Sequence, residues 1–163
     1  MNYGEKALEY RKKGYNCAQS VLCAIAERVG LDVEDARNMS AGFGGGLRAG
    51  EACGTYCGAV LAISRAVCKG EEDGKPEAPL AEVIAQFAQE FKEKFEVIRC
   101  SDLMEANGGV KETCQQYIAW CADRAAEYIA EHENDEPYDS SKAQEEQRKR
   151  PSNPGKWRGA PNN

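Results

Sequence analysis

The sequence predicts an all-α protein, a compact bundle of about four to five helices with a disordered C-terminal tail. Three observations support this fold class. Apolar residues recur with helical spacing in several segments, and no segment alternates as a half-buried strand does. Alanine, which favours helices, is abundant, whereas every Leu, Ile, Val and Phe lies before residue 132. At 163 residues the chain suits one domain, which we expect over residues 1–132, with a flexible polar tail over residues 133–163.

The first part of the chain is predicted to form a charged helix, a capped helix and a short helix. Residues 4–13 have a charged helical pattern. Asn16 is expected to cap a second helix that runs to about Val29, because a glutamine three residues after it completes a capping box. Asp32 caps a short third helix, which ends in the glycine-rich loop of residues 42–46.

The second part of the chain is predicted to contain a buried helix, an amphipathic helix and a final helix. Residues 52–67 are apolar or small on nearly all sides, which indicates a central helix. A strongly amphipathic helix follows a charged loop, and its apolar face consists of Leu80, Ile84, Phe87, Phe91 and Phe95. A turn at residues 99–101 and a pair of glycines precede the last helix, expected over about residues 111–131.

Charge and hydropathy exclude two classes of partner. The formal net charge is −6, whereas a nucleic-acid surface needs a concentration of Lys and Arg. The longest apolar stretch, residues 59–63, is too short to cross a bilayer. The first residues also lack the apolar region of a secretory signal. We therefore expect a cytoplasmic protein that binds neither nucleic acid nor membrane.

Cysteine is the residue type that points most directly to chemistry. The chain has eight: Cys17, Cys23, Cys53, Cys57, Cys68, Cys100, Cys114 and Cys121. They make up about 5% of the residues, below the roughly 8–10% of a disulfide scaffold. In a cytoplasmic protein such thiols favour metal or redox chemistry over structural disulfides. The chain has a single histidine, so any metal site would consist mostly of sulfur.

Four of the cysteines fall at or next to the beginnings of predicted helices. These four are Cys17, Cys53, Cys100 and Cys114. A helix N-terminus carries unpaired N–H groups and a positive partial charge, which favour a thiolate. The same N–H groups can donate hydrogen bonds to the sulfurs of an anionic metal cluster. We therefore predict that these four residues are the redox-active thiols or the metal ligands of the protein.

The other four cysteines have simpler or open interpretations. Cys23, Cys68 and Cys121 lie on or near apolar helix faces, so they are expected to be ordinary core thiols. Cys57 stands one helical turn after Cys53, where it could be a fifth ligand, a resolving thiol or core filler. Their spacing suits shared ligation better than an unstrained disulfide.

The glycine-rich loop is predicted to reverse the chain and to bring backbone amides close to the sulfurs. It fits neither a dinucleotide fingerprint nor a P-loop, and no strand precedes it. The candidate cofactor-binding positions here and at the next helix are Gly44, Gly45, Gly46, Arg48 and Gly54. Arg48 and Arg99 could compensate the negative charge of the sulfurs. Glu51 and Asp102 could handle protons, but acids at helix starts are more often simply solvated.

Three short motifs surround the first two of the four helix-start cysteines: the NCAQSVL of residues 16–22, the FGGG of residues 43–46 and the GEACG of residues 50–54. Together they resemble the C_GCAxxG_C_C family of redox-active proteins. The remaining two characteristic cysteines of the family match Cys100 and Cys114. The resemblance covers about residues 5–130 and implies a redox role with four working cysteines.

One part of the family pattern differs in this chain. The Cys-Gly-Ala-x-x-Gly motif becomes CGTYCG over residues 53–58, with Thr55 in place of alanine and an additional Cys57. A register that starts at Cys57 lacks the last glycine, because Ala62 stands there. The Gly-Glu pair before Cys53 favours the first register.

The resemblance also bears on the cofactor. A related domain in split-Soret cytochromes combines non-haem iron with haem, which favours an iron–sulfur site here. The chain has no Cys-x-x-Cys-His, so covalent haem is not expected.

Three functions remain open at this point. The leading hypothesis is electron transfer to or from a redox partner protein through a four-cysteine iron–sulfur cluster of unknown type. A second is metal-free thiol–disulfide chemistry, and a third is a zinc-stapled binding module without redox activity. Whether the protein is an enzyme, and whether a homodimer completes the site, stays undecided.

Overall fold

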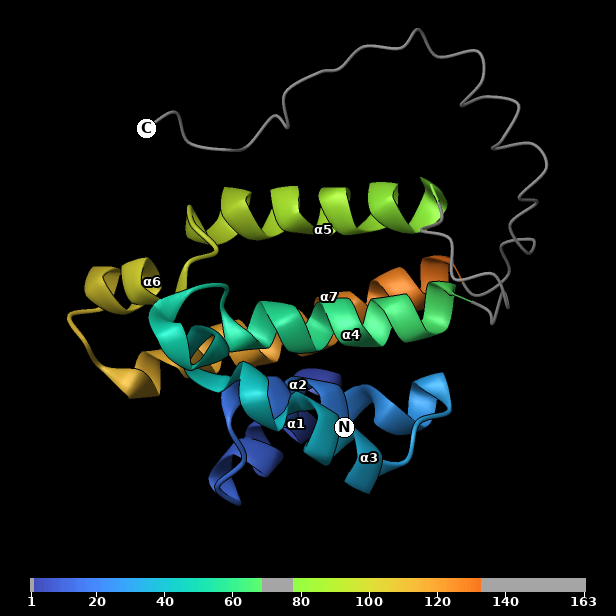
Figure 1. Ribbon diagram of the computed structural model, residues 1–163, viewed down its shortest axis with the longest axis horizontal. Coiled ribbons are helices and arrows are strands. Elements are labelled where there is room, and N and C mark those ends of the chain that lie inside the picture. The colour runs from blue at the N-terminus through green and yellow to red at the C-terminus, as the bar shows by residue number, and fades with distance from the viewer. Residues whose placement is uncertain (1, 69–77, 133–163) are drawn as a thin grey trace, which may run out of the picture.

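The computed structural model describes residues 2–68 and 78–132 (Figure 1). The described residues are all-helical without a strand, which confirms the predicted fold class. The expected tail, residues 133–163, lies outside the described residues. The α-helices are α1 (Tyr3–Lys12), α2 (Cys17–Ile25), α3 (Val33–Ser40), α4 (Gly54–Val67), α5 (Ala78–Phe95), α6 (Cys100–Ala106) and α7 (Cys114–Glu131).

The expected number of about four to five helices is wrong, because the described part of the chain contains seven α-helices. The clearest omission is α6, which spans 7 residues and starts in a segment predicted to be a turn. A helix of two turns is too short to show an apolar period. Shorter helical segments connect the α-helices: η1 (Ala26–Val29), η2 (Ala41–Phe43), η3 (Gly46–Gly50) and η4 (Lys111–Thr113).

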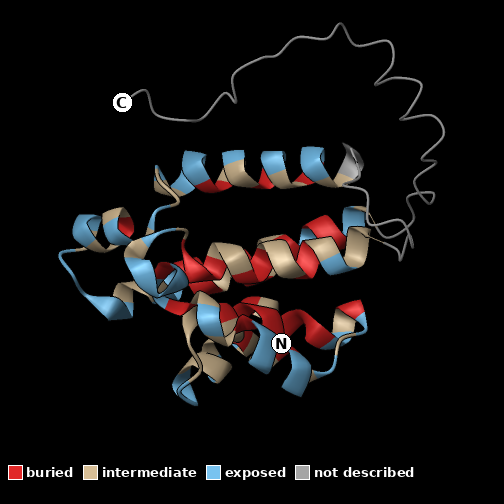
Figure 2. Cartoon of the chain, in the orientation of Figure 1, coloured by how far each residue is buried: buried red, intermediate tan, exposed pale blue. Residues whose placement is uncertain are grey.

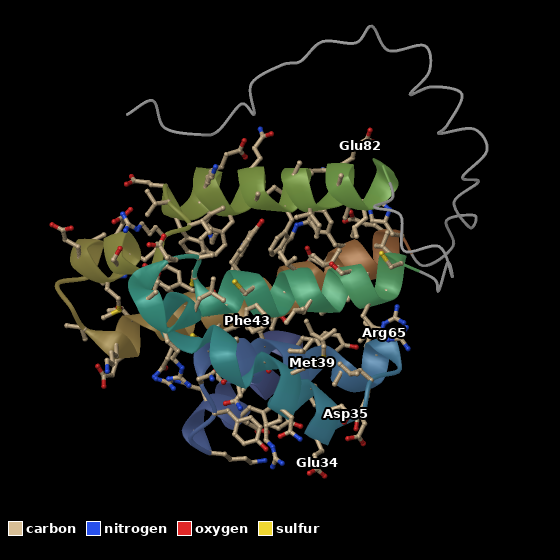
Figure 3. The ribbon with its side chains drawn as sticks, in the orientation of Figure 1. Glu34, Asp35, Met39, Phe43, Arg65 and Glu82 are labelled. Carbon is tan, nitrogen blue, oxygen red and sulfur yellow. The ribbon has the colours of Figure 1, made fainter. Side chains whose placement is uncertain are left out.

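The helices form three layers, with α5 on one side, α4 and α7 in the middle, and α1, α2 and α3 on the other side (Figure 1). Helix α2 packs against α1, α4 and α7, and α1 also packs against α7. Buried residues lie on the faces where the layers meet (Figure 2). The charged side chains of Glu34, Asp35 and Glu82 point away from these interfaces (Figure 3).

Helix α5 packs through the aromatic face that its amphipathic pattern predicts. Phe87 and Phe91 are fully buried, and Phe95 is half-buried. The Phe87 ring lies 5.6 Å from that of Tyr56 in α4 and 5.7 Å from that of Trp120 in α7, measured between centroids. Aromatic pairs at these separations stabilise the fold beyond the apolar area that they bury.

None of the helices in the described ranges has the length and apolar character needed to span a membrane.

The contact between α2 and α4 depends on small residues. A Cβ atom added to Gly58 would lie 2.6 Å from the backbone oxygen of Ala18 and 3.2 Å from Cβ of Val21. The backbone of α4 therefore touches α2 directly.

Replacing Gly58 by alanine is expected to lower the free energy of unfolding by up to about 2 kcal/mol, because the new methyl group would push α4 away from α2. Overpacking costs about 1–3 kcal/mol, of which the better helix propensity of alanine offsets about 1 kcal/mol. The control is Gly42→Ala, since Gly42 has open space around it and no positive φ. Chemical denaturation should separate the two variants, and equal stability of both would contradict the close-packing argument.

Candidate functional site

The four predicted cysteines each stand at the start of a helix. Cys17 is the first residue of α2, after an Asn16 cap whose side chain accepts a hydrogen bond from the backbone N–H of Gln19. Cys53 is the N-cap residue of α4. Cys100 and Cys114 are the first residues of α6 and α7. The starts of α4, α6 and α7 lie at the same end of the molecule (Figure 1).

Backbone pairing brings Cys53 and Cys100 together, although they are far apart in the sequence. Ala52 and Arg99 form an isolated antiparallel bridge just before the two cysteines. The backbone N–H of Cys53 donates to the carbonyl oxygen of Ile98 at 2.9 Å. The backbone N–H of Cys100 donates to the backbone carbonyl oxygen of Glu51 at 2.6 Å. These two hydrogen bonds fix the relative position of the α4 and α6 starts.

Cys17 reaches the same place from the adjacent layer, to which α2 belongs. A Cβ atom added to Gly54 would lie 2.5 Å from Sγ of Cys17 and 2.8 Å from the carbonyl oxygen of Phe43. The Cys17 sulfur therefore rests against the backbone of the residue that follows Cys53. Any side chain at Gly54 would displace this sulfur, which explains the glycine at this position.

The glycine-rich loop packs against Cys100 through Gly46 and against the Asn16 cap of α2 through Gly44. A Cβ atom added to Gly46, where φ is 62°, would lie 2.6 Å from Cβ of Cys100. One added to Gly44 would lie 2.7 Å from Cγ of Asn16, so this glycine packs on the cap of α2. Gly45 adopts a φ of 63° and has open space around it, so it serves the turn and not a contact.

Cys114 completes the group from the start of α7. Its Sγ lies 3.7 Å from the sulfur of Met104, which projects from α6. Burial is the main reason that the pKa of the Cys114 thiol rises to about 11; the other three cysteines add to the rise, and Arg11 opposes it. Met104 stands one helical turn after Cys100, so the contact with Met104 places Cys114 beside the start of α6.

Burial raises the pKa of Cys53, Cys100 and Cys114. Cys53 is only 5% exposed, and its burial raises the pKa more than the Thr55 hydroxyl and nearby backbone N–H groups lower it. Burial also raises the pKa of Cys100, with further contributions from Cys53 and Cys17. The expectation that helix starts would favour the thiolate is therefore wrong for the metal-free forms of Cys53, Cys100 and Cys114.

Thr55 links the site to the core. Its hydroxyl oxygen lies 3.1 Å from Sγ of Cys53, and the thiol of Cys121 donates to it at 3.5 Å. Thr55 and Cys121 are both fully buried. Cys121 is thus a core thiol, as expected. It also contacts the Thr55 hydroxyl, which in turn contacts Cys53. The threonine that departs from the family pattern is a direct neighbour of a site sulfur.

The remaining cysteines differ in their relation to the site. Cys57 is half-buried, and burial followed by Cys53 and Cys17 raises its pKa to about 11. Its thiol donates to the Ala52 carbonyl at 3.8 Å, so it lies beside the group of four. Cys23 is a buried core thiol that donates to Val33, as expected. Cys68 is half-buried at the C-cap of α4, directly after the last residue of the helix.

The charged residues predicted near the sulfurs have other partners. The Arg48 guanidinium donates to the Ala41 carbonyl at 3.1 Å, and Arg99 forms an exposed ion pair with Glu51 at 3.3 Å. Asp102 accepts a hydrogen bond from the Ser101 hydroxyl at 3.3 Å. Glu51 is therefore the ion-pair partner of Arg99.

The spacing of the side chains limits the kinds of metal site that they could form. A tetrahedral zinc site has Zn–S distances of about 2.3 Å, which requires sulfurs within about 4 Å of one another. Among residues 2–68 and 78–132, no three His, Cys, Asp or Glu side chains lie close enough to hold one metal ion. The donor set of four thiols would suit an iron–sulfur cluster, whose cysteines are distributed over two or more irons, so that no three of them need to share one metal ion.

Three neighbours of the site had no role in the sequence predictions. Thr55 was visible only as a departure from the family motif. Met104 stands four residues after Cys100 in α6, a spacing that places both on one face once the helix is known. Arg11 comes from α1 by long-range packing, and no local pattern in the sequence indicates it.

Comparison with known proteins agrees with the cysteine pattern. The family model described as "Putative redox-active protein (C_GCAxxG_C_C)" matches residues 15–128, well over half of the chain and all four site cysteines. No curated protein and no solved structure matches the chain. On the strength of this match, the chain belongs to the C_GCAxxG_C_C family of redox-active proteins.

Proposed function

We propose that this protein transfers electrons through an iron–sulfur cluster held by Cys17, Cys53, Cys100 and Cys114. The observation that carries the proposal is the convergence of four cysteines from four separate segments at one end of the bundle. Membership in a family of redox-active proteins supports the broader redox role. All four cysteines belong to one chain, so the proposal needs no second subunit.

The environment of the thiols favours metal ligation over metal-free thiol chemistry. Thiol–disulfide exchange starts from a thiolate, and a raised thiol pKa makes the thiolate scarce at neutral pH. Burial raises the pKa of Cys53, Cys100 and Cys114. A bound metal supplies the positive charge that deprotonates its ligating thiols. These thiols would thus be poor nucleophiles alone and suitable ligands with a metal.

The protein contributes position, hydrogen bonds and limited access. When bound, an iron–sulfur cluster would supply reversible electron transfer. Backbone pairing and the glycine contacts hold the thiols in place, and the Thr55 hydroxyl lies against Cys53. Cys53 is buried, whereas Cys17, Cys100 and Cys114 are half-buried. The site is therefore near the surface, where a redox partner protein in the cytoplasm could approach it.

Anaerobically purified protein is expected to contain iron and acid-labile sulfide and to absorb visible light. Single Cys→Ala variants at positions 17, 53, 100 and 114 should each lose most of the iron, because each removes one of four ligands. The matched control is Cys23→Ala, since Cys23 is buried and its thiol donates to Val33 instead. Protein without iron, sulfide or visible absorption would contradict the cluster.

Replacing Thr55 by valine is expected to lower the reduction potential by about 20–60 mV. The hydroxyl near Cys53 stabilises the more negative reduced state, and a hydrogen bond contributes about 0.5–1.5 kcal/mol. Valine keeps the size of the side chain, and Thr55→Ser is the control that keeps the hydroxyl. Potentiometric titration measures the shift, and equal potentials in both variants would rule out this role.

The alkylation rate of Cys114 tests the alternative of metal-free chemistry. With a pKa of about 11, the rate in metal-free protein should rise about tenfold per pH unit from pH 7 to about pH 9.5. Only the thiolate reacts, and its fraction grows with pH until the pKa is reached. Mass spectrometry after brief iodoacetamide treatment resolves each cysteine. A plateau near pH 7 would indicate a low pKa and would favour thiol–disulfide chemistry.

A further inference from the structure

A pocket opens between the second half of α1 and the start of α7, beside the cysteine site. Its volume is about 340 Å³. This is at the lower end of the roughly 300–1,000 Å³ that small-molecule pockets occupy, so it suits a small ligand. The lining residues are Leu8, Arg11, Lys12, Lys111, Glu112 and Gln115.

The lining is strongly positive in a chain whose net charge is −6. Arg11, Lys12 and Lys111 contribute three cations, and Glu112 is the single carboxylate. Within the described part of the chain, none of these three cations forms an ion pair with an Asp or Glu side chain. Three cations that gather in one concave site without carboxylate partners favour an anionic ligand.

Arg11 is the residue best placed to recognise such a ligand. It is half-buried, and its Nη1 donates to the backbone oxygen of Tyr15 at 2.9 Å. This hydrogen bond holds the guanidinium in one position and leaves its other N–H groups for a ligand. Arginine binds carboxylate and phosphate groups through paired hydrogen bonds, whereas Lys12 and Lys111 act as point charges.

The pocket adjoins the cysteine site. Gln115, which lines it, directly follows Cys114 in α7. Lys111 and Glu112, which also line it, lie in η4, the short helical segment that ends directly before Cys114. An anion bound at Arg11 would therefore lie near the edge of the sulfur group.

We infer that this pocket binds a small, multiply charged anion carrying carboxylate or phosphate groups next to Cys114. The inference goes beyond the proposed electron transfer and does not depend on it, because the lining cations are not sulfur ligands. Glu112 opposes binding of a simple polyanion and would favour a ligand that also carries a hydrogen-bond donor.

Isothermal titration calorimetry of the full chain tests this inference, with inorganic phosphate, pyrophosphate and citrate as probes in about 0.15 M salt. We expect saturable binding to one site, with pyrophosphate or citrate stronger than phosphate. Preference for pyrophosphate would identify a phosphate ligand, and preference for citrate a carboxylate ligand. Binding by none of the three probes would overturn the inference.

Charge variants locate the site. The double variant Lys12→Gln/Lys111→Gln should weaken binding by about tenfold or more, while Glu112→Gln should strengthen it by about twofold to tenfold. Lys92→Gln/Lys94→Gln removes the same charge from α5 and should change affinity by less than about twofold. The substituted residues of the pocket are exposed, so the fold should survive. Equal weakening in both double variants would show non-specific attraction and would refute the site.

Hydrogen exchange provides an independent position for the ligand. Citrate or pyrophosphate should slow exchange in residues 8–12 and 111–115, and not in α5. Iron content should be the same in all of these variants, which separates failure of the pocket from failure of the cluster. Protection that appears only elsewhere in the chain would disprove binding at this pocket.

Discussion

The close approach of α4 to α2 is the contact on which the rest of the structure depends. At Gly58 the backbone of α4 touches that of α2, and at Gly54 it touches the sulfur of Cys17. With side chains at these positions the two helices would separate, and Cys17 would move away from Cys53. The same approach supports the core, because the other face of α4 receives the aromatic rings of α5. The fold and the site therefore both depend on glycine at positions 54 and 58, where α4 has no side chain to hold it away from α2.

Two opposing effects act on the cysteines, and their sizes decide which one prevails. A helix N-terminus favours negative charge by typically 0.3–1 kcal/mol, or up to about 2 kcal/mol in partly buried positions. Burial of an ionisable group can shift its pKa by several units, and each unit corresponds to about 1.4 kcal/mol. The raised pKa of Cys53 and Cys114 shows that burial prevails. Placement at a helix start thus explains hydrogen bonding to sulfur, but it does not create a reactive thiolate.

Local patterns in the sequence predicted what local chemistry determines. The Asn16 cap, the apolar stripe of α5 and the helix-start positions of three site cysteines all follow from residues close together in the chain. Cys100 was expected in a turn, and the short helix α6 that it begins was missed. The sequence could not show how these segments meet, because the Ala52–Arg99 bridge and the Arg11 position arise from packing between distant segments. Arg48 illustrates the limit: it is close in sequence to the cysteines, yet its guanidinium donates to Ala41.

Charge balance connects the cysteine site with the pocket beside it. Four thiolates concentrate negative charge, and Arg11 is the cation that acts on Cys114. An anion bound to Arg11 would offset part of that positive influence and so would disfavour the more negative, reduced state of the site. Linkage is reciprocal. If the bound anion lowers the affinity of the site for an electron by a given factor, oxidation of the site must strengthen anion binding by the same factor. If the protein has both sites, the potential at which it transfers electrons therefore depends on the anion concentration.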